Sequence, residues 1–160
     1  MVLTKNEKKI LKYLLVHFDR EFSINEIARG CNLSPNGAYK ILKKFESEKI
    51  LYHKKIANVR PYKINFDYWK TELILKLALM SDEQAEEATQ LADACISSKN
   101  LLIIAHESRV SELKKNHPGC TTLAADNVSK NMDVVRKYVL GGEVTHGCTT
   151  IIDLFRNGSR

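Results

Sequence analysis

The sequence predicts an α+β protein in which a basic, helical N-terminal region precedes a helical middle and a mixed C-terminal region. Residues 1–66 show three short amphipathic helix patterns followed by two strand-like runs. Residues 67–97 carry apolar residues at helical spacing. Residues 98–160 alternate strand-like and helix-like segments, which is typical of a small α/β domain. We therefore expect two domains joined by a helical connector.

Composition limits the class of protein. The chain has 160 residues, of which 44% are hydrophobic and 28% are charged, as in ordinary globular domains. These values exclude a largely disordered chain, a collagen and a disulfide scaffold. The most apolar stretch, Leu73–Met80, is short for a bilayer span and contains Lys76. The N-terminus lacks a signal-peptide pattern, so we expect a soluble cytoplasmic protein with no membrane partner.

Positive charge is concentrated at the N-terminus. Residues 1–66 hold 14 Lys and Arg against 6 Asp and Glu, a net charge of +8. Residues 67–160 hold 11 against 13, a net charge of −2, which gives +6 for the whole chain. A basic region of this kind indicates a polyanionic partner such as nucleic acid. The alternative is a solvated surface that only keeps the protein soluble.

The first two predicted helices begin with capping boxes. Thr4 is followed three residues later by Glu7, and Ser23 is followed in the same way by Glu26. Apolar residues recur at helical spacing after each cap. The second helix is expected to end in a tight turn over residues 30–32.

The third predicted helix starts with Ser34 as its cap and Pro35 in the favoured first position. Its expected buried stripe is Ile41, Leu42 and Phe45. The residues that then point outward are Ser34, Asn36, Gly37, Tyr39, Lys40, Lys43 and Lys44. Residues 50–56 and 61–66 follow as two strands around a turn, with polar residues at Lys54, Lys55, Asn58 and Arg60.

This order of elements resembles a winged helix-turn-helix domain of the kind found in bacterial and archaeal transcription regulators. The resemblance is carried by SINEIARGCNLSPNGAYKILKKFESEKIL and the following YHKKIANVRPYKI. It implies sequence-specific binding of double-stranded DNA by a regulator of archaeal type. The third helix, residues 34–48, would lie in the major groove, and the wing, residues 52–62, would lie on the backbone or in the minor groove.

We expect each outward residue to contribute according to its chemistry. Asn36 and Tyr39 can hydrogen-bond or stack, and Lys40 can contact a guanine edge or a phosphate. The remaining lysines and Arg60 suit phosphates, Asn58 sits at the wing tip, and Gly37 lets the helix start approach DNA closely. Free N–H groups at the helix start also favour a phosphate. Alternatively, the domain is a protein-interaction module in which the lysines keep the surface soluble.

The middle of the chain predicts two more helices. One carries an apolar stripe of Trp69, Leu73, Ile74, Leu77 and Met80, and the other runs from Ser81 through Ile96. Such a stripe either packs against another domain or forms a dimer seam. We expect a homodimer, because the stripe is very apolar for a linker. The two DNA-binding domains of a homodimer would also match the two half-sites of a palindromic operator.

The C-terminal region predicts strands over 101–105 and 121–125 and a short extended segment over 143–146. It also predicts helices over 108–116 and 149–155, and between them a helix that begins at Asn127 or Ser129 and runs through Val139. The segments LLIIAHESRV and NMDVVRKYVLGGEVTHGCTTIIDLF resemble those of small nucleotidyltransferase domains. That family needs a Gly-Ser pair for triphosphate and paired carboxylates for magnesium. Here residues 106–109 are His-Glu-Ser-Arg, and Asp126 stands alone.

We therefore carry over a degenerate nucleotidyltransferase-like fold without its activity, and expect no enzyme and no catalytic residue. The domain would sense a small effector, which the sequence does not identify, or hold a dimer together. A divergent enzyme that binds a magnesium nucleotide near Ser108 and Asp126 is the alternative.

Two His/Cys pairs are the candidate metal ligands of this sequence. His117 and Cys120 form one pair, and His146 and Cys148 form another. Four such ligands suit zinc, but neither spacing is that of a zinc finger. A buried cysteine beside a turn histidine is more common, so we expect neither a metal nor another cofactor.

Overall fold

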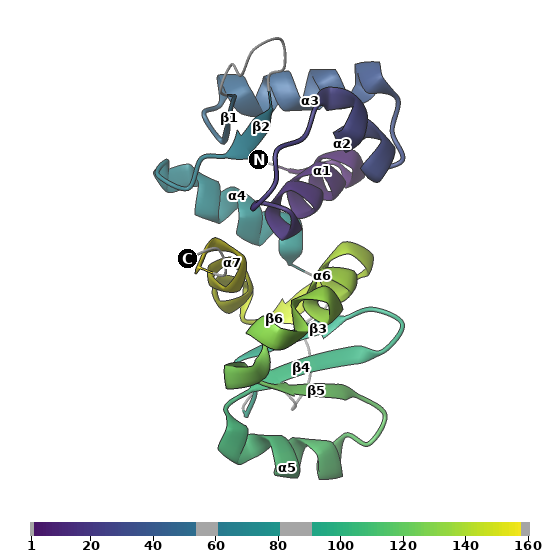
Figure 1. Ribbon diagram of the computed structural model, residues 1–160, viewed down its shortest axis with the longest axis vertical. Helices are drawn as coiled ribbons and strands as arrows, with labels where there is room; N and C mark the ends of the chain where they lie inside the picture. The colour runs from purple at the N-terminus through teal and green to yellow at the C-terminus, as the bar shows by residue number, and fades with distance from the viewer. Residues whose placement is uncertain (1, 54–60, 81–90, 158–160) are drawn as a thin grey trace. The chain divides into compact units, whose positions relative to one another are not determined.

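The structure, a computed structural model, describes residues 2–53, 61–80 and 91–157 (Figure 1). In this part of the chain it contains seven α-helices and two small sheets, which confirms the α+β class. The chain divides into two compact units, residues 1–78 and 79–158. Within the described ranges, no helix has both the length and the apolar character that a membrane crossing requires.

The first unit consists of helices around a short hairpin. Its elements are α1 (Lys5–Val16), α2 (Ile24–Gly30), α3 (Pro35–Ser47), β1 (Leu51–His53), β2 (Tyr62–Ile64) and most of α4 (Trp69–Leu79). Both predicted capping boxes are confirmed, at Thr4 and at Ser23. The strands pair antiparallel, with Leu51 opposite Ile64, and Phe22 forms an isolated bridge to Tyr62. The hairpin is thus tied to the segment between α1 and α2.

Left-handed residues end α2 and α3. Asn32 has φ 53°, and the next N–H, of Leu33, donates to the carbonyl oxygen of Ala28 at 2.8 Å. Lys49 has φ 62°, and the N–H of Ile50 donates to the carbonyl oxygen of Phe45 at 2.9 Å. Both arrangements satisfy carbonyl groups at a helix end and reverse the chain sharply. The tight turn expected over residues 30–32 is confirmed.

The buried face of α3 differs slightly from the expected one. Ala38, Leu42 and Phe45 are fully buried, whereas Ile41 is only partly buried. Positions 38, 42 and 45 are spaced by four and three residues, so they share one face of a helix. Ile41 lies at the edge of that face, so its predicted place in the core is wrong.

Helix α4 has two apolar faces. The buried face is formed by Ile74, Leu75 and Ala78. Of the stripe predicted from the sequence, only Ile74 is buried, and Trp69, Leu73, Leu77 and Met80 are exposed. The prediction chose the wrong face, because a helix with apolar residues on both sides offers no contrast by which to choose.

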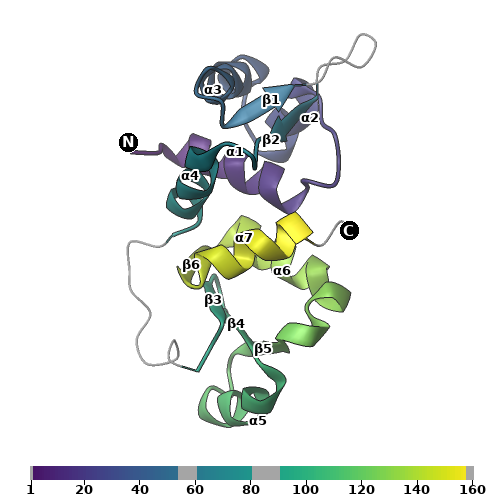
Figure 2. The same ribbon diagram turned by 90° about the vertical axis from the view of Figure 1, so that its left-hand side faces the viewer.

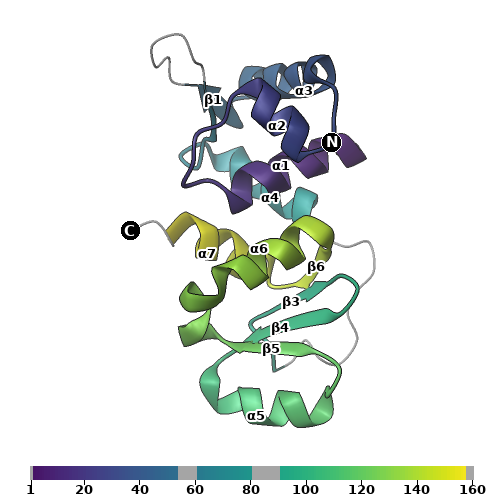
Figure 3. The same ribbon diagram turned by 45° about the vertical axis from the view of Figure 1, so that its right-hand side comes forward.

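The second unit contains a four-stranded mixed sheet in the order β5-β4-β3-β6 (Figure 3). Its strands are β3 (Ala94–Ser97), β4 (Leu101–Ala105), β5 (Thr121–Ala124) and β6 (Glu143–His146). Strand β3 is antiparallel to β4 and β6, and β4 is parallel to β5 across α5 (Glu107–Asn116). Two 3₁₀ turns (Ala125–Asn127 and Ser129–Asn131), α6 (Met132–Gly141) and α7 (Cys148–Asn157) complete it.

Strand β3 corrects the predicted connector helix. Residues 81–90 lie outside the described part of the chain, but Ala94–Ser97 form a strand where a helix was expected. Ala94, Cys95 and Ile96 are all fully buried because the strand is central and covered on both faces. A short continuous apolar run does not distinguish a buried strand from a helix. Its pairing with β4 decides the matter.

Both faces of the sheet are covered. Leu113 of α5 belongs to a cluster with Cys95, Ile103 and Ala105 on one face. On the other face, α6 packs against β3 and β6, and α7 packs against β3. Both helices contribute fully buried apolar residues to the unit, which are Val135, Val139, Ile151 and Phe155.

Candidate nucleic-acid interface

The start of α3 is organised by Ser34. Its Oγ accepts from the N–H of Gly37 at 3.1 Å, and its carbonyl oxygen accepts from the N–H of Ala38 at 2.9 Å. Since Pro35 has no N–H, the N–H of Asn36 is the one left in this turn for an outside acceptor. The expected group of several free N–H donors is therefore reduced to one.

The first turn of α3 carries no acidic residue. The first turns of α1 and α2 contain Glu7 and Glu26, and both carboxylates serve in capping boxes. A helix start has partial positive charge, which a carboxylate in the first turn compensates. The positive end of α3 therefore lacks the compensation that the other two helices have.

The structure separates the three lysines of α3. Lys40 is exposed, and no ion pair to another described residue is found for it. Nζ of Lys43 lies 2.9 Å from Oε2 of Glu46 on the same helix. Nζ of Lys44 lies 2.6 Å from Oε1 of Glu7 on α1. Lys40 is the lysine of α3 that presents its charge to solvent.

Lys44 stabilises a buried carboxylate. Glu7 is only 5% exposed, and burial by itself would raise its pKa. The hydrogen bonds from Lys44 and from the N–H of Thr4 outweigh burial, so that the pKa of Glu7 is lowered. The same contact raises the pKa of Lys44. This ion pair joins α3 to the first turn of α1.

Glu46 connects α3 to both strands of the hairpin. Its carboxylate accepts from Lys43, lies 2.7 Å from Nδ1 of His53 on β1, and accepts from the hydroxyl of Tyr62 on β2 at 3.4 Å. The hydrogen bond from Lys43 is the main cause that lowers the pKa of Glu46. Burial, followed by the Glu46 charge, raises the pKa of Tyr62. One carboxylate thus links α3 to both strands of the hairpin.

The structure therefore groups some of the predicted residues and not others. Asn36, Tyr39 and Lys40 lie exposed within the first two turns of α3, with Tyr39 46% exposed. A Cβ on Gly37 would lie 3.0 Å from Oγ of Ser34, so a side chain there would crowd the cap. The predicted wing residues Lys54, Lys55, Asn58 and Arg60 lie outside the described residues.

Sequence reasoning missed Glu7, Glu46 and His53 as residues that hold the interface together. Glu46 has a weak signal in the sequence, since it follows Lys43 by three positions on a helix. Glu7 was recognised as part of a capping box, but its contact with Lys44 spans 37 positions. Nothing in the sequence indicates that contact.

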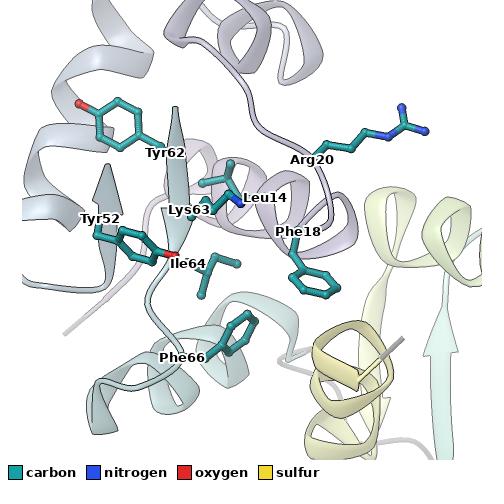
Figure 4. A pocket seen from close by; sticks show the side chains of 8 residues that line it. All are labelled: Leu14, Phe18, Arg20, Tyr52, Tyr62, Lys63, Ile64 and Phe66. Atoms are coloured by element: carbon teal, nitrogen blue, oxygen red, sulfur yellow. The ribbon is translucent and has the colours of Figure 1, made fainter. Parts of the chain in front are cut away.

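A pocket of about 210 Å³ lies beside the hairpin in the first unit (Figure 4). Its apolar walls come from α1, the hairpin and the segment after β2, and its lining residues are Leu14, Phe18, Arg20, Tyr52, Tyr62, Lys63, Ile64 and Phe66. The guanidinium of Arg20 points away from the aromatic rings, and Nζ of Lys63 lies 2.9 Å from Oε1 of Glu21. The pocket therefore has a largely aromatic interior and an ion pair near its rim.

The second unit places two predicted groups after neighbouring parallel strands. His106 follows β4, and its Nδ1 lies 2.9 Å from Oγ of Ser108 at the start of α5. Asp126 follows β5, and the two strands end level with each other at Ala105 and Ala124. The predicted nucleotide site at Ser108 and Asp126 stays a prediction.

Across the described ranges, no group of three or more His, Cys, Asp or Glu is arranged to hold a metal ion. The two His/Cys pairs at 117/120 and 146/148 therefore do not assemble into a four-ligand site. All four cysteines are free; Cys31 and Cys95 are buried, and Cys120 and Cys148 are partly exposed. Burial raises the pKa of both buried thiols to about 11.

Comparisons with models of protein families, with curated proteins and with solved structures found no match to this chain.

Proposed function

We propose that this protein is a sequence-specific, double-stranded-DNA-binding transcriptional regulator whose first unit is a winged helix-turn-helix domain. One observation carries the proposal. The exposed start of α3 presents Asn36, Tyr39 and Lys40 on a unit whose first three helices include a tight α2–α3 turn and are followed by a hairpin. The charge surplus of residues 1–66 supports it, because DNA binding needs a basic surface.

In this proposal α3 lies in the major groove with its first two turns nearest the bases. Asn36 can donate to and accept from an adenine edge, and Lys40 can donate to guanine. Lys43 reaches a phosphate by leaving Glu46, whereas Lys44 acts through Glu7 as a positioning residue. The wing supplies Lys54, Lys55, Asn58 and Arg60 to the backbone or minor groove. A cytoplasmic location and an effector for the second unit belong to the same proposal.

The test is a fluorescence-anisotropy titration against a pool of genomic fragments, including the region upstream of the protein's own coding sequence. It is done at two salt concentrations, because phosphate contacts weaken steeply with salt. The expected result is a small set of fragments whose binding persists at the higher concentration. Uniform binding that disappears with salt would contradict the proposal and favour a protein-interaction module.

A pair of variants tests the site itself. Lys40→Ala should weaken binding to the selected fragment about tenfold and make the salt dependence shallower by about one unit of slope. Lys115→Ala is the matched control, since Lys115 is an exposed lysine at the end of α5 in the other unit. Equal affinities for the two variants, with both folded, would remove Lys40 from the interface.

A further inference from the structure

Helix α4 exposes a row of large apolar side chains. Trp69 is 69% exposed, Leu73 is 52% exposed and Leu77 is 43% exposed. They are spaced four residues apart and so form one stripe, which we call the outer face of α4. The opposite face of the helix, with Ile74, Leu75 and Ala78, is buried, and Figure 2 shows α4 beside α1. A helix that is apolar on both faces is normally covered on both.

We propose that a second copy of this chain covers the outer face, so that two α4 helices pack antiparallel across a two-fold axis. This homodimer does not depend on DNA binding. It would extend the function proposed above by pairing two α3 helices for a palindromic site.

The spacing of the stripe is self-complementary in one antiparallel register. If the axis passes at the level of Ile74, Leu73 of each copy lies between Leu73 and Leu77 of the other. With a rise of about 1.5 Å per residue, the stripe residues of the two copies then alternate every ~3 Å. Trp69 of each copy closes the row beside Leu77 of the other. The apolar residues of the two copies therefore alternate along the seam.

Charge selects the same register. Nζ of Lys76 lies 2.8 Å from Oε1 of Glu72, and both residues border the outer face on one flank. In the antiparallel pair centred on Ile74, Glu72 of each copy lies level with Lys76 of the other, and they share a flank. In a parallel two-fold pair, Glu72 and Lys76 of one copy would lie on the opposite flank from those of the other copy, so these charges would not meet across the seam. Attraction across the axis therefore favours the antiparallel arrangement.

The first experiment measures mass by analytical ultracentrifugation over a wide dilution range. The wild-type chain should be a dimer, and Leu73→Glu should be a monomer because it buries a charge in the seam. Leu140→Glu should remain dimeric, since Leu140 is another exposed leucine, 45% exposed, and lies on α6. Trp69 is the one tryptophan of the sequence, so its emission should shift to the red as the wild-type dimer dissociates.

The second experiment tests the register by charge exchange. Glu72→Lys and Lys76→Glu should each weaken self-association about five- to tenfold, because each puts like charges together across the axis. A mixture of the two variants should associate as strongly as wild type, since opposite charges then meet. Glu112→Lys, the same charge change on an exposed site of α5, should leave self-association unchanged.

Several outcomes would overturn the proposal. A wild-type chain that is monomeric at every concentration would do so. If the Trp69 emission of that monomer were also blue-shifted, the chain would cover the outer face of α4 itself. A Leu73→Glu variant that remains dimeric would place the dimer interface elsewhere. Failure of the charge-exchanged mixture to associate would reject the antiparallel register. None of these measurements uses DNA, so their failure is distinguishable from failure of the proposed function.

Discussion

Nζ of Lys44 lies 2.6 Å from Oε1 of Glu7, so a lysine that the sequence assigns to DNA is part of the packing between α3 and α1. The other carboxylate oxygen of Glu7 accepts from the N–H of Thr4 at 2.7 Å. One buried side chain thus satisfies the start of α1 and fixes α3 against it. A variant at Lys44 would change the fold before it changed any contact with DNA.

Lys44→Ala should lower the free energy of unfolding of the first unit by about 1–2 kcal/mol, because a buried carboxylate loses a charged hydrogen bond. Lys40→Ala should change it by less than about 0.5 kcal/mol, as at an ordinary surface site. Denaturant unfolding followed by Trp69 fluorescence measures both. Similar losses for the two variants would show that the Glu7 contact contributes little.

Acid should destabilise the first unit through Glu7. The pKa of Glu7 is lowered in the folded state from an ordinary value of 4.5, so the contribution of Glu7 to folding stability is fully present above that pH. The contribution is lost as the pH falls through the lowered pKa, because the unfolded chain then binds the proton more readily. Denaturation midpoints measured over this pH range should fall more steeply for wild type than for Glu7→Gln. If the stability of wild type and of Glu7→Gln fell in parallel with pH, Glu7 would not be the source of the acid destabilisation.

Lys49→Gly should stabilise the first unit by about 0.5–1 kcal/mol. Lys49 has φ 62°, a left-handed conformation that costs a side-chain-bearing residue about 1–2 kcal/mol, and part of the gain is offset by unfolded-state entropy. The amide of Asn65 donates to the carbonyl oxygen of Lys49, so this bond survives the change. The control is Glu48→Gly, where φ is −83° and glycine should destabilise. A loss of stability in Lys49→Gly would refute this account.

Gly147→Ala should destabilise the second unit by about 2 kcal/mol or more. Gly147 has φ 73°, and a Cβ there would collide with the carbonyl oxygen of Asp93 beside β3. Gly119→Ala is the matched control, since a Cβ on Gly119 meets nothing within 4 Å. Hydrogen exchange of the β3 and β6 amides should quicken in the first variant alone. Unchanged protection at Gly147→Ala would mean that the strands shift to accept the methyl group.

Local signals predicted much of the fold. The capping boxes at Thr4 and Ser23, and the Ser34–Pro35 start, use contacts within four residues, so these helix starts could be placed from the sequence. Strand β4 and helices α5 and α7 were also placed within a few residues. Strand β3 could not be placed, because Cys95 and Ile96 suit a helix and a strand equally until β4 pairs with them.

The candidate site likewise has local features that the sequence predicts and long-range contacts that it does not. The sequence by itself determined that α3 starts at Ser34 and carries Asn36, Tyr39 and Lys40, because helix periodicity and caps depend on near neighbours. Only the tertiary structure decided that Lys44 belongs to Glu7, and that the hairpin is held through Glu46. It also decided that Leu73, and not Leu75, faces solvent on α4. These depend on residues far apart in the chain, whose proximity exists only after folding.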